Sequence, residues 1–269
     1  MNTGDLDRLL AVALDAARVG GAIVSEEFGA PREVREKAPG DWVSAADLRS
    51  ESAVRDVLAA ATPEIPVLGE EGGGERDAAL GWLVDPLDGT ANFLHGLEAV
   101  GVSIGLVEDG VPIVGVVHAP LLGRTYSARR GGGAFRDDEP IRVSERGPAQ
   151  AICATGFPFR HKELIERYLA VFSAALHSLE DLRRIGGASL DLAWTAHGVF
   201  DGYFELALGP WDVAAGGLLV REAGGVVTDW AGDDRRWLIS GDVVAASPPV
   251  HEFLLELIAN NSFDRPDME

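Results

Sequence analysis

Several features that define other protein classes are scarce in this chain. It contains one cysteine, Cys153, in 269 residues, so no disulfide can form within it. The small apolar neighbours of Cys153 indicate a buried strand thiol rather than a nucleophile. No stretch approaches the roughly 18 uncharged apolar residues of a membrane span, and residues 1–10 lack the apolar core of a signal peptide. We therefore expect a soluble protein of a reducing cytoplasm, without a membrane partner.

Basic residues are also scarce. The chain has 23 Lys and Arg against 43 Asp and Glu, a formal net charge of −20, which argues against nucleic acid or an anionic membrane as a general partner. Its six histidines are scattered, without the spacing of a zinc site. An acidic protein can bind an anionic phosphate only where the local field is reversed, and divalent metal ions held by clustered carboxylates would do that.

The pattern of apolar residues predicts two halves. Residues 1–147 combine two helices, over Asp5–Val24 and around Leu48–Leu58, with an antiparallel sheet, and a polar connection at Pro31–Asp41 joins the helices. Residues 148–269 alternate strands and helices, which indicates a layered α/β half. Because no low-complexity linker separates the halves, we expect them to pack as one body, with a polar tail at 260–269.

The expected elements of the two halves can be stated by range. In the first half the expected strands are Ile65–Leu68, Trp82–Val84, the hairpin within Val100–Val117, Thr125–Ala128 and Ile141–Val143. In the second half the expected strands are Ala151–Thr155, Val199–Leu206, Val226–Thr228 and Val243–Ala246, and the expected helices are Glu163–Leu179, Leu190–Ala196, Val213–Ala223 and Phe253–Ile258.

The most informative stretch is Trp82–Phe93, where an apolar strand leads into two aspartates and then into Gly89-Thr90. Carboxylates at a strand end are hard oxygen ligands of the kind that Mg²⁺ prefers. Backbone N–H groups at a helix start are suited to phosphate. Pro86 stiffens the turn between Asp85 and Asp88 and leaves the Leu87 carbonyl free to face a cation. A turn followed by a helix cap would also explain this combination of residues.

Three further acids stand at the ends of expected elements. Glu70 follows a short strand, where open α/β sheets bind ligands, although this segment taken alone is better explained as an exposed loop. Asp47 completes the capping-box spacing Ser44-x-x-Asp47, so capping alone would account for it. Asp212 stands at a helix start and is either a cap or a ligand, and the small residues after it would let that helix approach its neighbours closely.

Read together, these segments resemble the inositol monophosphatase family. The stretch Trp82–His95 is similar to one family signature, and Trp211–Gly225 is similar to a second. Gly69-Glu70-Glu71 and Asp41–Asp47 fall in the family's order and spacing, and Ala154–Phe159 resembles a segment of bacterial members. The resemblance covers nearly the whole chain and implies a layered αβαβα fold, of the type shared with fructose-1,6-bisphosphatase.

The resemblance also implies the chemistry. Two or three Mg²⁺ ions, with Mn²⁺ as a substitute, would be held by Glu70, Asp85, the Leu87 carbonyl, Asp88 and Asp212. Thr90 and Asp47, assisted by Glu70, would orient a metal-activated water for in-line attack on phosphorus without a phosphoenzyme. The residues implied to contact the substrate are Asp88, Gly89, Thr90, Gly186, Gly187, Ala188 and Glu205. A homodimer and inhibition by lithium are typical of the family and are expected here.

The substrate and two rival functions remain open at this stage. We expect a small phosphate ester, inositol 1-phosphate foremost, although relatives act on fructose 1,6-bisphosphate, histidinol phosphate or 3′-phosphoadenosine 5′-phosphate. Arg160, His161, Arg183 and Arg184 could contact a second charged group or lie on the surface. A haloacid-dehalogenase-type phosphatase is disfavoured because Asp85 and Asp88 lie one residue too far apart. A metal-dependent protein that binds the ester without hydrolysing it is the alternative from another class.

Overall fold

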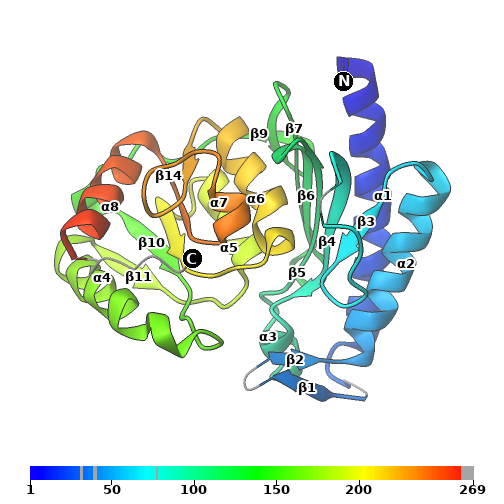
Figure 1. Cartoon of the computed structure of the whole chain (residues 1–269), viewed down its shortest axis with the longest axis horizontal. Coiled ribbons are helices and arrows are strands. Elements are labelled where there is room, and N and C mark those ends of the chain that lie inside the picture. The colour runs from blue at the N-terminus through cyan, green and yellow to red at the C-terminus, as the bar shows by residue number, and fades with distance from the viewer. Residues whose placement is uncertain (31–32, 39–40, 77, 262–269) are drawn as a thin grey trace.

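Two β-sheets with a pair of helices between them form the centre of the protein (Figure 1). The computed structural model describes residues 1–30, 33–38, 41–76 and 78–261. The larger sheet has the strand order β3-β4-β5-β6-β7-β8-β9 and the smaller has β11-β10-β12-β14-β13. The bounds of the larger sheet are β3 (Val67–Gly69), β4 (Leu80–Asp88), β5 (Gly101–Glu108), β6 (Val111–Ala119), β7 (Arg124–Arg129), β8 (Gly133–Arg136) and β9 (Glu139–Ile141). Those of the smaller sheet are β10 (Ile152–Thr155), β11 (Asp181–Arg183), β12 (Gly202–Glu205), β13 (Val226–Thr228) and β14 (Val243–Ala246).

Helices cover both outer faces and fill the space between the sheets (Figure 1). The outer face of the larger sheet carries α1 (Thr3–Glu27) and α2 (Ala45–Ala61), and the outer face of the smaller sheet carries α4 (Ile165–Ser178) and α8 (Pro248–Asn261). The central pair is α5 (Ala188–Ala196) and α6 (Pro210–Glu222). Two shorter helices, α3 (Thr90–Leu94) and α7 (Trp237–Ser240), complete the set of α-helices among the described residues, which also contain three 3-10 helices, Pro120–Leu122, Pro148–Gln150 and Lys162–Leu164. The predicted αβαβα layering is thus confirmed.

The three apolar cores follow these layers. One lies between the α1–α2 pair and the larger sheet and contains Leu9, Trp82 and Ile104. A second surrounds α5 and α6, and a third lies between the smaller sheet and α4 and α8. Cys153 is buried in the third core, as predicted. The two sheets fall on either side of residue 147, and the division of the chain into two halves at that point stays a prediction.

Several local predictions were wrong. The connection expected over Pro31–Asp41 enters a short hairpin, in which β1 (Arg35–Ala38) pairs with β2 (Asp41–Val43). The sequence did not predict it because β1 is charged and exposed and lacks the alternation of apolar and polar residues that indicates a strand. The strand expected over Ile141–Val143 ends at Ile141, and only Gly202–Glu205 of the strand expected over Val199–Leu206 form β12. The strands β8 and β11 and the helix α7 were not foreseen because each has four residues or fewer. Part of the expected tail, 262–269, lies outside the described residues.

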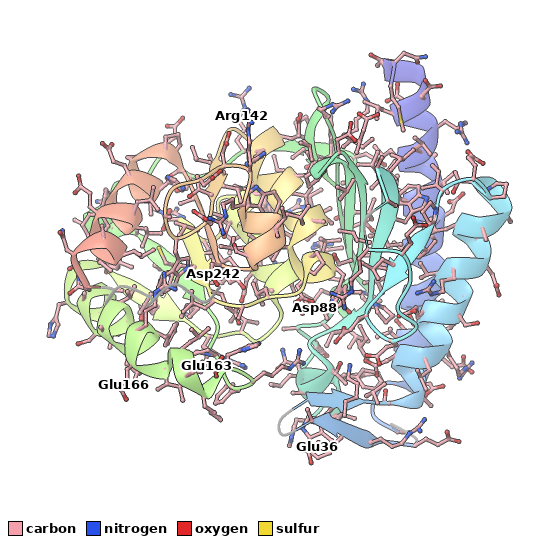
Figure 2. All side chains as sticks on the ribbon, viewed as in Figure 1. Glu36, Asp88, Arg142, Glu163, Glu166 and Asp242 are labelled. Atoms are coloured by element: carbon pink, nitrogen blue, oxygen red, sulfur yellow. The ribbon has the colours of Figure 1, made fainter. Side chains whose placement is uncertain are left out.

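No helix in the described part of the chain is long and apolar enough to cross a bilayer. Figure 2 shows how the acidic side chains are distributed over this framework. Glu163 and Glu166 lie on the outside around α4, whereas Asp88 lies between the two sheets (Figure 2). Most of the acidic excess is therefore surface charge, and a small part of it is buried at the centre of the molecule.

Candidate active site

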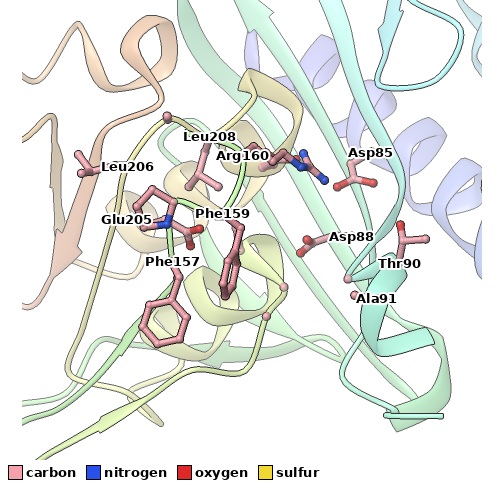
Figure 3. Close-up of a pocket in the computed structure, with 18 of the residues that line it drawn as sticks. Asp85, Asp88, Thr90, Ala91, Phe157, Phe159, Arg160, Glu205, Leu206 and Leu208 are labelled. Carbon is pink, nitrogen blue, oxygen red and sulfur yellow. The ribbon is translucent and has the colours of Figure 1, made fainter. Parts of the chain in front are cut away.

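The two aspartates of the Trp82–Phe93 stretch face one pocket because β4 contains a bulge. Three residue steps from Asp85 to Asp88 pair with two steps from Ser103 to Gly101 on β5. Side chains alternate along a regular strand, so residues three apart would point to opposite faces. One extra residue reverses that alternation, and both carboxylates line the same pocket of about 180 Å³ (Figure 3).

Three carboxylates from three elements converge in this pocket. Glu70, Asp85 and Asp212 each offer one oxygen, and these oxygens lie within 4.8 Å of one another. Glu70 reaches the cluster because β3 runs parallel to β4, with Gly69 opposite Val84, so that both strands end at the same edge. Asp212 is the third residue of α6, where its Oδ2 accepts the Gly209 N–H at 2.7 Å.

Glycines on the larger sheet allow α6 to bring Asp212 into place. A β-carbon at Gly115 would lie 2.8 Å from the carbonyl oxygen of Ala215, and one at Gly105 would lie 2.8 Å from the Ala214 side chain. The backbone of α6 therefore packs directly on β5 and β6, as the run of small residues predicted. The Ser103 hydroxyl fixes the contact by donating to the Trp211 carbonyl at 2.9 Å.

The electrostatics of the cluster call for a cation. Burial and the neighbouring acids hold the pKa of Asp85 and of Asp212 well above its usual range. The pKa of Asp88 is also raised, chiefly by burial. Buried like charges are costly unless a counter-charge is present. The set of hard oxygen donors fits a divalent cation of the Mg²⁺ type, and it contains no nitrogen or sulfur ligand among the described residues.

A hydroxyl and a carboxylate lie beside the cluster in hydrogen-bond contact. Thr90 Oγ1 donates to Asp47 Oδ1 at 2.9 Å and also lies 3.1 Å from the Leu87 carbonyl oxygen. The other Asp47 oxygen accepts the N–H and the hydroxyl of Ser44, which closes the predicted capping box. Asp47 thus caps α2 with one oxygen and contacts Thr90 with the other. Burial raises its pKa despite these bonds.

The opposite wall of the pocket comes from the residues after position 147. It is formed by Gly186, Gly187 and Ala188 at the start of α5, by Glu205 on β12 and by the segment that follows β10. Asp88 contacts this wall through the Ser189 N–H at 2.7 Å and the Ser189 hydroxyl at 2.5 Å. Figure 3 shows Glu205 across the pocket from Asp85, Asp88 and Thr90. Burial raises the pKa of Glu205 to about 7, against the lowering effect of the Tyr203 hydroxyl and of Arg184.

Three of the four basic residues noted in the sequence line the pocket. These are Arg160, His161 and Arg184, and they are accompanied by the aromatic rings of Trp42, Phe157 and Phe159. The Arg184 guanidinium lies 5.6 Å from the ring centroids of both Phe157 and Phe159. Arg183 is instead exposed and pairs with Asp181 outside the pocket. Phe157, Phe159 and Arg184 thus form part of the opposite wall, whereas the Arg160 guanidinium extends toward Asp85 (Figure 3).

Every predicted site residue lies in or beside this one pocket. Those that line it are Glu70, Asp85, Leu87, Asp88, Gly89, Thr90, Gly186, Gly187, Ala188, Glu205 and Asp212. Asp47 lies behind Thr90 and is 1% exposed. The four segments that the sequence presents separately are thus one site in space.

Sequence reasoning missed the residues that hold the site in place. The Glu51 carboxylate accepts the N–H groups of Glu71 and Gly72, both at 2.8 Å, and fixes the turn after β3. The sequence did contain an indication of this role, because Glu51 lies four residues after Asp47 and a helix places both acids on one face. Lys37 on β1 donates to Glu70 at 3.2 Å and to Glu71 at 2.7 Å. Ser189 and Lys37 left no local pattern, since their partners Asp88 and Glu70 are distant in sequence.

Known proteins match this chain over most of its length. Residues 5–262 match the model of the inositol monophosphatase family. A putative Nus factor SuhB of Neisseria meningitidis is 42% identical over 94% of this chain and 99% of its own. An inositol-1-monophosphatase of Rhizobium meliloti is 40% identical over 93% of this chain and 96% of its own.

Solved structures agree with the match in sequence. The extragenic suppressor protein SuhB of Bartonella henselae has a TM-score of 0.88 at 36% identity, over 93% of this chain and 98% of its own. The inositol monophosphatase of Anabaena has a TM-score of 0.87 at 33% identity, over 96% of this chain and 97% of its own. The fold, the acidic cluster and these matches agree, and the chain belongs to the inositol monophosphatase family of metal-dependent phosphatases.

Proposed function

We propose that this protein hydrolyses inositol 1-phosphate to inositol and phosphate by direct attack of water on phosphorus. The observation that carries the proposal is the pocket itself. One wall joins a cluster of three carboxylates to the hydrogen-bonded pair Thr90–Asp47, and the other offers the acceptor Glu205. Hydrolysis of a phosphate ester with a hydroxylated leaving group requires all three features: positive counter-charge for the phosphate, an acceptor for the proton of water, and a hydrogen-bond acceptor for the hydroxyls of the leaving group.

The cofactor that we propose is Mg²⁺, with Mn²⁺ as a substitute. The residues that would hold it are Glu70, Asp85, the Leu87 carbonyl, Asp88 and Asp212, and two or three ions would share them. When bound, Mg²⁺ supplies positive charge for the phosphate oxygens and makes water acidic enough to attack near neutral pH.

The Thr90–Asp47 pair is proposed to accept the proton of the attacking water. Thr90 Oγ1 already donates its own proton to Asp47, so its lone pair can accept a hydrogen bond from water. The raised pKa of Asp47 brings this carboxylate nearer to the pH at which a general base works well. Glu70, on the other side of the cluster, would assist in orienting the water.

The opposite wall is proposed to bind the alcohol portion of the substrate. Gly186, Gly187 and Ala188 leave room for a ring because they carry little or no side chain. Asp88 and Glu205 would accept hydrogen bonds from ring hydroxyls, and the N–H groups of Gly89 and Thr90 would face the phosphate.

A second candidate substrate carries a second charged group. Arg160 and Arg184 line the pocket of an otherwise acidic protein, which favours esters such as fructose 1,6-bisphosphate or 3′-phosphoadenosine 5′-phosphate. Histidinol phosphate remains an alternative on the same mechanism. Inhibition by lithium, a homodimer and a cytoplasmic location stay predictions from the family resemblance.

The experiment measures phosphate release from these four esters with Mg²⁺ and with a chelator. The proposal expects inositol 1-phosphate to have the highest kcat/KM and the chelator to abolish its hydrolysis. If a bisphosphate is preferred, the proposed mechanism stands and the second candidate replaces inositol 1-phosphate as the substrate. Binding of an ester with no release of phosphate would instead support the alternative of a non-catalytic binding protein.

A further inference from the structure

Glu205 is held from behind by a buried tyrosine that the proposed mechanism does not use. Tyr203 and Glu205 are two residues apart on β12, so their side chains project from the same face of the strand. The Tyr203 side chain is 0% exposed, and its hydroxyl donates to Glu205 Oε2. Among the described residues, this hydroxyl is the one group that hydrogen-bonds the Glu205 carboxylate.

The backbone at Gly156 confines the same carboxylate. A β-carbon at position 156 would lie 2.0 Å from the Glu205 carboxylate oxygens, so this carboxylate packs directly on the Cα of Gly156. A glutamate side chain has three rotatable bonds, and fixing it requires contacts that restrict each of them. Here the hydroxyl restrains one oxygen, and the close backbone restricts the movement of the whole group.

A second buried carboxylate lies on the side of Glu205 away from the pocket arginines. Asp191 on α5 is 1% exposed, and its Oδ1 has no hydrogen-bond partner among the described residues. Burial, followed by the charges of Glu205 and Asp88, raises its pKa well above the usual range. This side of Glu205 is therefore buried and already acidic, whereas Arg184 attracts the carboxylate from the pocket, so a carboxylate released from Tyr203 would leave its present position.

We propose that Tyr203 is a positioning residue that determines specificity for hydroxylated esters. Its hydroxyl holds Glu205 Oε2, so that Glu205 Oε1 remains available to a hydroxyl of the substrate. The inference rests on the proposed role of Glu205 and extends it to a residue outside the pocket. A carboxylate fixed in this way discriminates between substrates, because an ester without that hydroxyl gains nothing from it.

The test compares two esters in the variant Tyr203→Phe, with Mg²⁺ present. For inositol 1-phosphate we expect kcat/KM to fall about tenfold, mostly through a higher KM, which is the typical effect of one hydrogen bond. For p-nitrophenyl phosphate, which lacks hydroxyls on its leaving group, we expect a change of less than about twofold. Equal losses on the two esters would overturn the proposal, because they would indicate a general structural effect.

The matched control is Tyr168→Phe. Tyr168 is also buried, at 1% exposure, but its hydroxyl contacts Thr155 at 3.0 Å rather than a pocket carboxylate. Its loss should leave the ratio of the two kcat/KM values unchanged. A shift of that ratio as large as in Tyr203→Phe would contradict the special role of Tyr203.

A double-mutant cycle with Glu205→Gln asks whether Tyr203 acts through Glu205. Adding Tyr203→Phe to Glu205→Gln should cost no further activity on inositol 1-phosphate, whereas additive losses would overturn the proposal. In the double variant, Glu205→Gln removes the carboxylate charge that Tyr203→Phe alone would leave without its donor. If Tyr203→Phe alone does not fold, the double variant can still be compared with Glu205→Gln. If the wild-type protein hydrolyses neither ester, the proposed function and this inference both fail. If it hydrolyses both and Tyr203→Phe leaves their ratio intact, only the inference fails.

Discussion

The two walls of the pocket are built in different ways. On the acidic wall every carboxylate has a hydrogen-bond donor: Ser44 for Asp47, Leu87 for Asp85, Ser189 for Asp88, Gly209 for Asp212 and the Lys37 ammonium for Glu70. The opposite wall relies on glycines, on aromatic rings and on a single hydroxyl behind Glu205, and Phe159 within it is 51% exposed. The carboxylates of the acidic wall are thus held by donors from several segments, whereas Glu205 on the opposite wall depends on one hydroxyl and one close backbone contact, so a single substitution should release it.

The largest expected effect comes from breaking the acidic wall with Asp85→Asn. Losing one charged ligand removes several kcal/mol of charge stabilisation, so kcat/KM should fall about 1000-fold or more. The rise in Tm on addition of Mg²⁺ should be lost as well. Because burial and like charges raise the pKa of Asp85, the metal-free variant should melt no lower than the wild type.

The control for Asp85→Asn is Asp15→Asn on the outer surface of α1. Asp15 is exposed and pairs only loosely with Arg18, at 3.4 Å, so activity and the response to Mg²⁺ should stay unchanged. A variant at Asp85 that kept a Mg²⁺-dependent Tm would show that the metal binds elsewhere.

A smaller loss is expected from Asp47→Asn, which leaves the carboxylate cluster intact. If Asp47 accepts the proton from Thr90, kcat should fall about 100-fold or more, as for the loss of a general base. KM and the affinity for Mg²⁺ should change little, which a metal titration by calorimetry can check. A parallel fall of Mg²⁺ affinity and kcat would place Asp47 among the metal ligands instead.

The opposite wall can be tested alone with Gly156→Ala. The new β-carbon would lie 2.0 Å from the Glu205 carboxylate and must displace it. We expect a loss of about tenfold in kcat/KM for inositol 1-phosphate, with unchanged hydrolysis of p-nitrophenyl phosphate and unchanged Mg²⁺ affinity. Gly147→Ala is the matched control, since a β-carbon there meets nothing within 4 Å. An equal loss of kcat/KM for both esters would contradict the separate role of the opposite wall.

The mildest test varies pH. Asp85 and Asp212 have raised pKa values without metal, so they retain protons at a pH where ordinary aspartates are ionised. Mg²⁺ must displace these protons, and its affinity should rise with pH by up to about tenfold per unit for each proton released. Calorimetry at pH 6 in buffers of different ionisation enthalpy should detect the release, which declines once the carboxylates are ionised. A Mg²⁺ affinity that does not change with pH would contradict the raised pKa values of Asp85 and Asp212.

The same groups make the metal-free protein less stable as pH rises. Above about pH 4 the unfolded aspartates lose their protons while the buried ones retain theirs, so the free energy of unfolding falls with increasing pH. Thermal unfolding with chelator and with Mg²⁺ should therefore diverge from pH 5 to pH 8. Convergence of the two Tm values over this range would argue against metal binding at the cluster.

The sequence predicted the residues that line the pocket better than the residues that hold them in place, for a physical reason. Asp85, Asp88, Thr90, Asp47 and Asp212 stand in short motifs whose turn, cap and strand-end positions are local properties. Ser189 and Lys37 act through contacts with segments distant in sequence, which no local pattern reports. The hairpin β1–β2 was missed because its first strand is exposed throughout and so lacks a buried face to produce alternation.

The bulge in β4 makes the site depend on a count of residues as well as on their identity. With the extra residue, Asp85 and Asp88 face the same pocket. If these three steps paired regularly with β5, one of the two aspartates would turn toward the opposite face of the sheet, although every acidic residue would still be present. The pairing of this short segment thus decides whether the carboxylates form one site, and loss of the bulge would be a more severe lesion than many substitutions.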